Sequence, residues 1–307
     1  MTIRFFSWRW RSTASAIRPL TRYLWSHKIL LSLVLGSIAL LSWLTTPAQA
    51  FQVQVQPTNP QLGDTISVVV QAEAGAAPTI TMGDRTYPTF ALSGERYRAL
   101  LPTSPLDRPG RMNLRISQGG ETQDVALTLR DRSFPTQRIR VSGGGSGGTE
   151  HEMSRVDEFK RILTPEKFWN GPMQRPNRGE ITSGYGVRRY YNGVFANNYY
   201  HKGVDYAGGT GSPTVAPAAG RIVLVGRVAD GFRLHGNTVG IDHGQGVASI
   251  FIHLSRIDVR EGDFVQAGQT VGAVGATGSA TGPHLHWGLY LHGVSVDPVP
   301  WRYDGFD

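Results

Sequence analysis

The residues best able to do chemistry are histidines, and they gather late in the chain. Seven of the nine histidines follow residue 200. They occur in three short patterns: His201-Lys202-Gly203-Val204-Asp205, Phe251-Ile252-His253-Leu254-Ser255 and His284-Leu285-His286. The chain has no cysteine, which excludes thiolate metal sites, a catalytic thiol and a disulfide framework. Any metal site must therefore use imidazole and carboxylate groups.

The spacing of these residues predicts that they converge when they lie on strands. Side chains alternate between the two faces of a strand, so His201 and Asp205 share a face in an extended segment. Gly203 and the glycines that follow disfavour a helix there, and Gly203 leaves room between the two groups. His284 and His286 share a face in the same way. Two such pairs on adjacent strands can meet around one metal ion.

Zinc chemistry matches this supply of groups. A zinc hydrolase takes three nitrogen or oxygen ligands and keeps the fourth position for a water, whose pKa falls to about 7. Glu180 and Glu261 are the only glutamates after residue 170, and Glu261 falls in a predicted solvated turn. Histidine is therefore predicted to handle the proton, with His253 and one member of the 284/286 pair as candidates. The spacing alone leaves open which member of that pair binds the metal, and both could.

The elements expected to position these groups are mainly β. From residue 171 onward, short apolar runs are broken by glycine or proline with almost no helical periodicity, which predicts a compact antiparallel β domain. A single amphipathic helix is expected just before it, where Thr149 and Glu152 form a capping box. The apolar residues at helical spacing there are Met153, Val156, Phe159 and Leu163.

The chain before this helix is predicted to hold a second β module, joined to it by a flexible linker. Residues 51–141 alternate with period 2 in short segments, and Gly119-Gly120 separates two of them as a hairpin turn would. This pattern favours an immunoglobulin-like β-sandwich. The sandwich carries no cluster of titratable groups, so it is interpreted as a spacer or binding module. Residues 142–170 comprise a Gly/Ser linker and the helix, and residues 171–307 form the domain with the histidines.

The N-terminal segment explains the basic charge of the chain. The formal net charge is +8, but residues 1–28 hold six basic side chains and no acidic one. An apolar run then leads to Ala48-Gln49-Ala50, so residues 1–50 are predicted to be a signal peptide or an N-terminal anchor. The remainder is nearly neutral, which argues against nucleic-acid binding. We expect an exported protein of the periplasm or cell envelope, with membrane contact only through an uncleaved N-terminal segment.

The histidine patterns resemble those of the lysostaphin-type, or LytM-like, zinc metallopeptidases that cleave peptidoglycan peptides. The resemblance covers roughly residues 179–301 and implies a barrel-sandwich-hybrid-type peptidase domain. It also implies that His201, Asp205 and His286 bind Zn²⁺, that His253 and His284 are catalytic, and that an upstream tyrosine (Tyr190, Tyr199 or Tyr200) stabilises the oxyanion. Phe251 departs from the tyrosine usual at its position, and we expect it to pack. The carrying motifs are ITSGYG (181–186), HKGVD (201–205), APAAG (216–220), GNTV (236–239), DHG (242–244), HLS (253–255) and TGSATGPHLHW (277–287).

Two other functions compete with hydrolysis as interpretations of the sequence. The segment from Val259 to Gln269 resembles the hairpin of biotinyl or lipoyl carrier domains, but no lysine follows Lys202, so the carrier function is excluded. The alternative that stays open is a LytM-like factor that has lost catalysis and activates a cell-wall amidase. Such factors lack some ligands or catalytic histidines, whereas all five positions are filled here. We therefore expect a zinc metalloendopeptidase that hydrolyses amide bonds in peptidoglycan stem or cross-link peptides.

Overall fold

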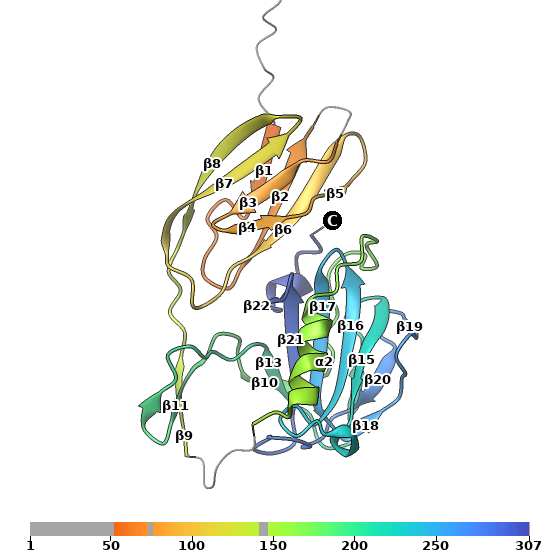
Figure 1. The fold of residues 1–307 in the computed structure, drawn as a ribbon. Helices are drawn as coiled ribbons and strands as arrows, with labels where there is room; N and C mark the ends of the chain where they lie inside the picture. Colours follow the sequence, from red (N-terminus) through yellow and green to blue (C-terminus); the bar gives the residue numbers. More distant parts are fainter. Residues whose placement is uncertain (1–51, 73–75, 141–146, 307) are drawn as a thin grey trace, which may run out of the picture. The chain divides into compact units, whose positions relative to one another are not determined.

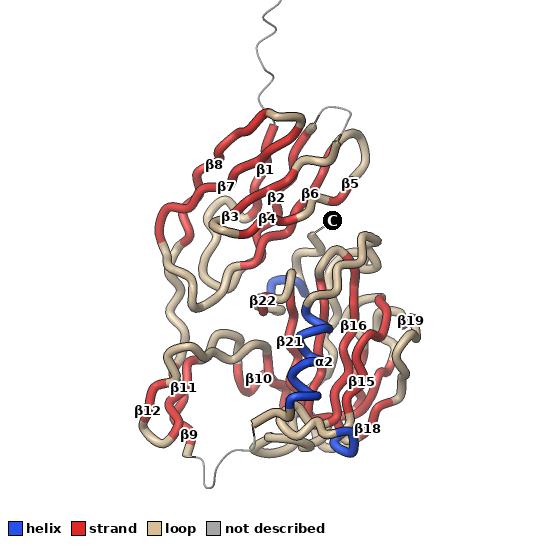
Figure 2. The backbone as a smooth tube through the Cα atoms, viewed as in Figure 1, coloured by secondary structure: helices blue, strands red, loops and turns tan. Residues whose placement is uncertain are grey.

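The computed structural model describes residues 52–72, 76–140 and 147–306 (Figure 1). The predicted signal or anchor segment and most of the Gly/Ser linker lie outside the described residues. The described chain is mainly β, as expected, and α2 (Glu150–Lys160) is its one α-helix (Figure 2). Within these ranges no helix combines the length and the apolar character needed to cross a membrane.

Two four-stranded antiparallel sheets form the first part of the described chain, in the orders β1-β2-β6-β5 and β4-β3-β7-β8. One core joins them, with Val68 and Ala99 from the first sheet and Ile80 and Leu114 from the second. This is a β-sandwich; its immunoglobulin-like character stays a prediction. The strands are β1 (Gln52–Gln56), β2 (Thr65–Gln71), β3 (Thr79–Met82), β4 (Arg85–Tyr87), β5 (Phe90–Ala91), β6 (Arg96–Pro102), β7 (Gly110–Gln118) and β8 (Glu121–Leu129).

The hairpin predicted around Gly119-Gly120 is confirmed. β7 and β8 pair in register from Gly110 opposite Leu129 to Gln118 opposite Glu121. The two glycines between them have φ angles of 59° and 91°. A two-residue turn with positive φ at both central positions matches the twist of the flanking strands, and glycine adopts it without steric cost.

An eight-stranded antiparallel sheet organises the rest of the chain, in the order β10-β13-β21-β17-β16-β15-β19 with β22 beside β21. The antiparallel β domain expected after residue 171 is therefore confirmed. Its strands are β10 (Glu180–Ser183), β13 (Val204–Ala207), β15 (Gly220–Gly226), β16 (Asn237–Gly244), β17 (Val247–Leu254), β19 (Phe264–Val265), β21 (Leu285–Leu291) and β22 (Val294–Val296).

Two small sheets complete the β structure, in the orders β14-β20-β18 and β12-β11-β9. In the second, β9 pairs in parallel with β11, so the segment that follows the sandwich adds a strand to a hairpin of the C-terminal part. Their strands are β9 (Thr136–Ile139), β11 (Arg188–Tyr191), β12 (Val194–Phe195), β14 (Pro213–Val215), β18 (Arg256–Ile257) and β20 (Thr270–Ala273). Two 3₁₀ turns are η1 (Val228–Asp230) and η2 (Pro300–Arg302).

The two faces of the large sheet pack against different cores. On β21, Leu285 and Trp287 face the main core, whereas Tyr290 faces a second core that includes Val156 and Phe159 of α2. The helix therefore covers the face that carries the even-numbered residues of β21, and Figure 1 shows it in front of this sheet, running along the strands. His286 belongs to this face because side chains alternate along a strand.

The helix begins where its capping box predicts. Thr149 is the N-cap, and its side chain accepts a hydrogen bond from the Glu152 N–H. The predicted apolar stripe is only partly correct: Val156 is buried, but Met153 and Leu163 are 39% and 49% exposed. The helix ends at Lys160, so Leu163 lies beyond the last turn and does not share its buried face.

Candidate active site

Three predicted ligand side chains converge on one point. The Asp205 Oδ1 lies 3.0 Å from the His201 Nε2 and 2.9 Å from the His286 Nδ1, and the two nitrogens are 3.0 Å apart. The ligand edges of a tetrahedral zinc site with bonds of 2.0–2.2 Å are about 3.3 Å. In the described ranges this is the one group of three or more such side chains with metal-site geometry.

Strand register places two members of this metal trio (His201, Asp205 and His286). Asp205 on β13 lies directly opposite His286 on β21, and directly paired residues present side chains to the same face. His201 is different, because it precedes β13 and was wrongly expected to lie on the strand. It is held by backbone hydrogen bonds, in which the His201 N–H donates to Val187 and its carbonyl accepts from Gly186.

A hydrogen bond on the far side of the His201 ring orients its Nε2 toward the other two members of the trio. The Nδ1 of this ring lies 2.7 Å from the Gly184 carbonyl oxygen, which can only accept, so Nδ1 carries the proton. The Nε2, which lies 3.0 Å from the Asp205 carboxylate, is then the nitrogen that can bind a metal. Neutral imidazole and carboxylate are also the form in which these groups bind zinc.

Burial sets the charge states of the other two members. Burial alone would raise the pKa of Asp205, but the adjacent His201 and His286 rings outweigh it and hold that pKa well below its usual range. Burial lowers the pKa of His286 to about 4, although its contact with Asp205 acts the other way. At neutral pH the trio therefore holds one carboxylate and a neutral His286.

Gly203 makes room for the neighbouring strand. A methyl group at this position would lie 2.2 Å from the Trp287 carbonyl oxygen and 2.8 Å from the His286 Nε2. Gly203 therefore leaves space for the Trp287 backbone and the His286 ring. Its small size lets β21 approach closely enough to bring His286 to Asp205.

A second histidine pair lies beside the trio. The rings of His253 and His284 have centroids 4.9 Å apart, and the His284 Nε2 lies 3.9 Å from the Asp205 Oδ1. The His253 Nδ1 donates to the Thr277 carbonyl and the His284 Nδ1 to the Gly282 carbonyl, each at 2.8 Å. Both rings in their neutral form therefore carry an unprotonated Nε2. Burial lowers the pKa of His253 to about 4, which keeps it neutral at pH 7.

A bulge in β17 turns the His253 side chain toward His284. Ile252 lies opposite His286, so strict alternation would send the next side chain to the other face of the sheet. The register with β16 shifts here, with two residues of β17 facing one of β16, and His253 has a φ of 64°. A left-handed non-glycine residue costs about 1–3 kcal/mol and is typical of functional sites.

Comparison with known proteins identifies this constellation. Residues 199–298, which include all five side chains, match the family model described as Peptidase family M23. Residues 199–298 are a peptidase family M23 domain. The resemblance to the lysostaphin-type metallopeptidases is thereby confirmed. The metal trio of this domain has the donor types that suit zinc.

Relatives of the M23 domain are named peptidases. DD-carboxypeptidase/endopeptidase Mpg of Neisseria meningitidis serogroup B is 42% identical over 99 residues, which cover 32% of this chain and 22% of that protein. Peptidoglycan DD-endopeptidase ShyB of Vibrio cholerae serotype O1 is 33% identical over 123 residues, which cover 39% of this chain and 27% of that protein. The matches span between 22% and 34% of the length of the first curated relatives.

The fold likeness extends beyond the M23 domain. A crystal structure of a protein described as a peptidase M23 from Pseudomonas aeruginosa is 29% identical, with a TM-score of 0.60. The match covers 81% of this chain and 96% of that one.

The structure also places Phe251 and two of the tyrosines that were candidates for stabilising the oxyanion. Phe251 is fully buried in the main core, as expected. Tyr200 is also buried, and its hydroxyl accepts a hydrogen bond from Ser295. The Tyr199 hydroxyl accepts from Arg189 at 2.8 Å. Burial raises the pKa of Tyr199 to about 12.

Two histidines outside the site, His243 and His235, form hydrogen bonds within the chain. His243 lies buried on β16, between the Ala219 carbonyl and the Ser249 hydroxyl. The pairing of His235 with Glu152 of α2 was missed: the His235 Nδ1 lies 2.7 Å from a carboxylate oxygen. The capping box drew attention to Glu152, but nothing local in the sequence links it to residue 235.

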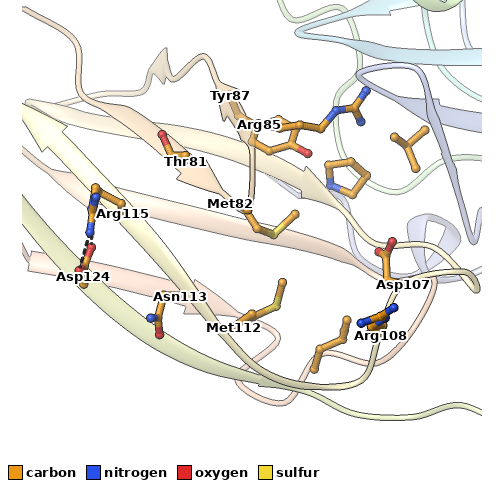
Figure 3. A pocket seen from close by; sticks show the side chains of 14 residues that line it. Thr81, Met82, Arg85, Tyr87, Asp107, Arg108, Met112, Asn113, Arg115 and Asp124 are labelled. Atoms are coloured by element: carbon orange, nitrogen blue, oxygen red, sulfur yellow. Dashed lines mark hydrogen bonds and ion pairs between the residues drawn. The ribbon is translucent and has the colours of Figure 1, made fainter.

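A cavity of about 580 Å³ lies away from these side chains, in the β-sandwich (Figure 3). Met82 of β3 and Met112 of β7 point into it, and Tyr87, Asp107 and Arg108 lie around it. None of the three residues of the metal trio lines this cavity, and neither does His253 or His284.

Proposed function

We propose that the chain is a zinc metalloendopeptidase that hydrolyses amide bonds in peptidoglycan peptides. His201, Asp205 and His286 hold the metal in this proposal. The observation that carries it is the set of three ligand atoms 2.9–3.0 Å apart, with the proton of His201 on the far nitrogen. Zinc bound there supplies a Lewis acid for the scissile carbonyl and lowers the pKa of a water.

His253 and His284 move the proton. Each ring has its Nδ1–H held by a backbone carbonyl, which fixes the ring and, in the neutral form, leaves Nε2 free to accept a proton. One ring takes a proton from the attacking water, and it then returns the proton to the leaving amine or steadies the tetrahedral oxyanion. The Tyr199 hydroxyl, which Arg189 holds, is a further donor for the oxyanion, and Tyr199→Phe is expected to lower kcat while zinc is retained.

The names of the relatives support the proposed substrate class. Both Mpg and ShyB are named for DD-peptidase activity, and ShyB is named for peptidoglycan. A D-amino-acid cross-link is therefore the bond to test first, with glycyl bridges as the comparison. Such a substrate lies outside the cytoplasm, which accords with the export signal predicted in residues 1–50.

Digestion of purified peptidoglycan tests this proposal directly. The zinc-loaded full chain should release muropeptides that mass spectrometry identifies as products of amide hydrolysis, and a chelator should stop the release. Defined cross-linked dimers and glycyl-bridged peptides, compared side by side, assign the bond. If the chain binds no zinc and releases nothing alone but accelerates a wall amidase, the activator function replaces the peptidase function.

A further inference from the structure

We propose that Glu152 of α2 is a positioning residue for His253. The proposal rests on the proposed function, because it assigns Glu152 a role in the reaction through another residue. Glu152 lies outside residues 199–298, which match the family model.

Glu152 is a carboxylate enclosed by hydrogen-bond donors. Its side chain is fully buried. The backbone N–H groups of Arg233, Leu234 and His235 donate to its oxygens at 2.6–3.1 Å, and the His235 Nδ1 lies 2.7 Å away. Successive backbone donors around one anion form a nest that fixes the backbone conformation of the segment.

Helix capping alone does not explain this burial. The capping contact of the carboxylate, with the Thr149 N–H, is 3.3 Å long and is the longest of its contacts. All the shorter contacts go to residues 233–235, more than 80 positions away in the sequence. A carboxylate needs no such nest to cap a helix, since capping groups function at exposed helix ends. The main partner of Glu152 is therefore the segment 233–235.

That segment holds the backbone of His253. The His235 carbonyl accepts a hydrogen bond from the His253 N–H at 2.9 Å, which is the backbone position with φ of 64°. Glu152 fixes the N–H side of residue 235, and the carbonyl of the same residue fixes His253. One residue thus separates the buried anion from the strained backbone of the histidine.

The same segment also supports the ring of His253. The Asn237 N–H donates to the Thr277 hydroxyl at 2.9 Å, and the Thr277 carbonyl accepts from the His253 Nδ1. A methyl group at Gly236 would lie 2.4 Å from the Thr277 carbonyl oxygen, so the two backbones touch. Displacement of residues 233–237 would therefore move both the main chain and the ring of His253.

The test compares Glu152→Gln with Glu158→Gln in the zinc-loaded full chain. The two substitutions are chemically identical and lie on the same helix, but the Glu158 side chain is 61% exposed. Glutamine keeps the shape of Glu152 and removes its charge. We expect Glu152→Gln to lower kcat about 10²-fold with KM and zinc content little changed, because a displacement near 1 Å has this effect on catalysis. Glu158→Gln should match the wild type.

Further variants and a spectroscopic signal separate positioning from general loss of stability. Val156→Ala removes packing from the same helix but leaves the Glu152 carboxylate and its hydrogen bonds in place, and it should lower Tm while kcat is kept. Glu152→Asp keeps the charge and should retain more kcat than Glu152→Gln. If the glutamine variant does not fold, a kcat of Glu152→Asp below that of the wild type, with zinc retained, supports the proposal. The ¹⁵N NMR signals of the His253 ring should move in Glu152→Gln and stay in Glu158→Gln.

The outcomes decide the proposal in one direction or the other. Wild-type kcat in Glu152→Gln overturns it, as does an equal loss of kcat in Val156→Ala at the same loss of Tm. A wild-type chain that cleaves no peptidoglycan refutes the proposed function instead. In that case the His253 NMR signal still tests whether Glu152 positions the ring, and an unchanged signal in Glu152→Gln refutes the positioning role.

Discussion

The metal trio and the histidine pair lie side by side, but different kinds of backbone hold them. Asp205 and His286 are directly opposed in the regular ladder between β13 and β21. His253 and His284 rest on irregular backbone: the first has left-handed φ in a bulge, and the second forms an isolated bridge to Gly275 just before β21 begins.

This difference separates binding from proton transfer. A regular ladder fixes ligand atoms with little strain, which suits a metal that must stay bound. A bulge re-aims a side chain out of the strand pattern, which allows His253 to reach the same face as His284. We therefore expect substitutions in the ladder to affect metal content and substitutions in the irregular region to affect turnover.

The largest effect is expected on the ladder side, from Asp205→Ala. The variant leaves two histidines without the carboxylate, and zinc affinity should fall by more than the ~10²-fold that loss of an outer partner can cause. Activity should vanish with the metal. Metal analysis after dialysis measures this, with Asp230→Ala, an exposed aspartate of η1, as the control. An unchanged zinc content would remove Asp205 from the ligand set.

On the irregular side, His253→Ala should reduce kcat by about 10²–10⁴-fold with zinc retained, because a proton-transfer group is lost and no ligand is touched. His284→Ala should behave alike. Steady-state kinetics on a cross-linked dimer, with metal analysis of the same samples, measure both effects. His151→Ala, an exposed histidine of α2, is the control. Full activity of His253→Ala would contradict the assigned role.

The same contrast explains how much the sequence could predict. Because side chains alternate along a strand, the sequence predicted that Asp205 and His286 could meet across adjacent strands. The glycine-rich turns and short apolar runs predicted the antiparallel fold. His201 was misplaced onto a strand because nothing local shows that β13 begins at Val204. The bulge at His253 depends on the register between β16 and β17, and the Glu152 contacts depend on packing of α2 against a distant loop. Both are properties of tertiary structure.

Buried histidines also predict how stability depends on pH. Burial lowers the pKa of His243, on the regular strand β16, to about 4, whereas it is near 6.5 when unfolded. The unfolded chain then binds more protons between these values, so unfolding free energy should fall as pH drops from about 6.5 to about 4, by up to ~1.4 kcal/mol per pH unit for this residue. Urea unfolding of the wild type and His243→Gln measures the slope. Equal slopes would refute the prediction.

The smallest expected effect isolates the strain in the bulge. His253→Gly and His253→Ala both remove the ring, but glycine adopts a φ of 64° without the steric cost that Cβ brings. The glycine variant should therefore be more stable than the alanine variant by about 1 kcal/mol, although glycine in an ordinary strand interior is less stable by a similar amount. The matched pair Ile250→Gly and Ile250→Ala, at a regular position of β17, should show the opposite order. If alanine is the more stable residue at both positions, the backbone at His253 is not left-handed in solution, and another cause must turn its ring toward His284.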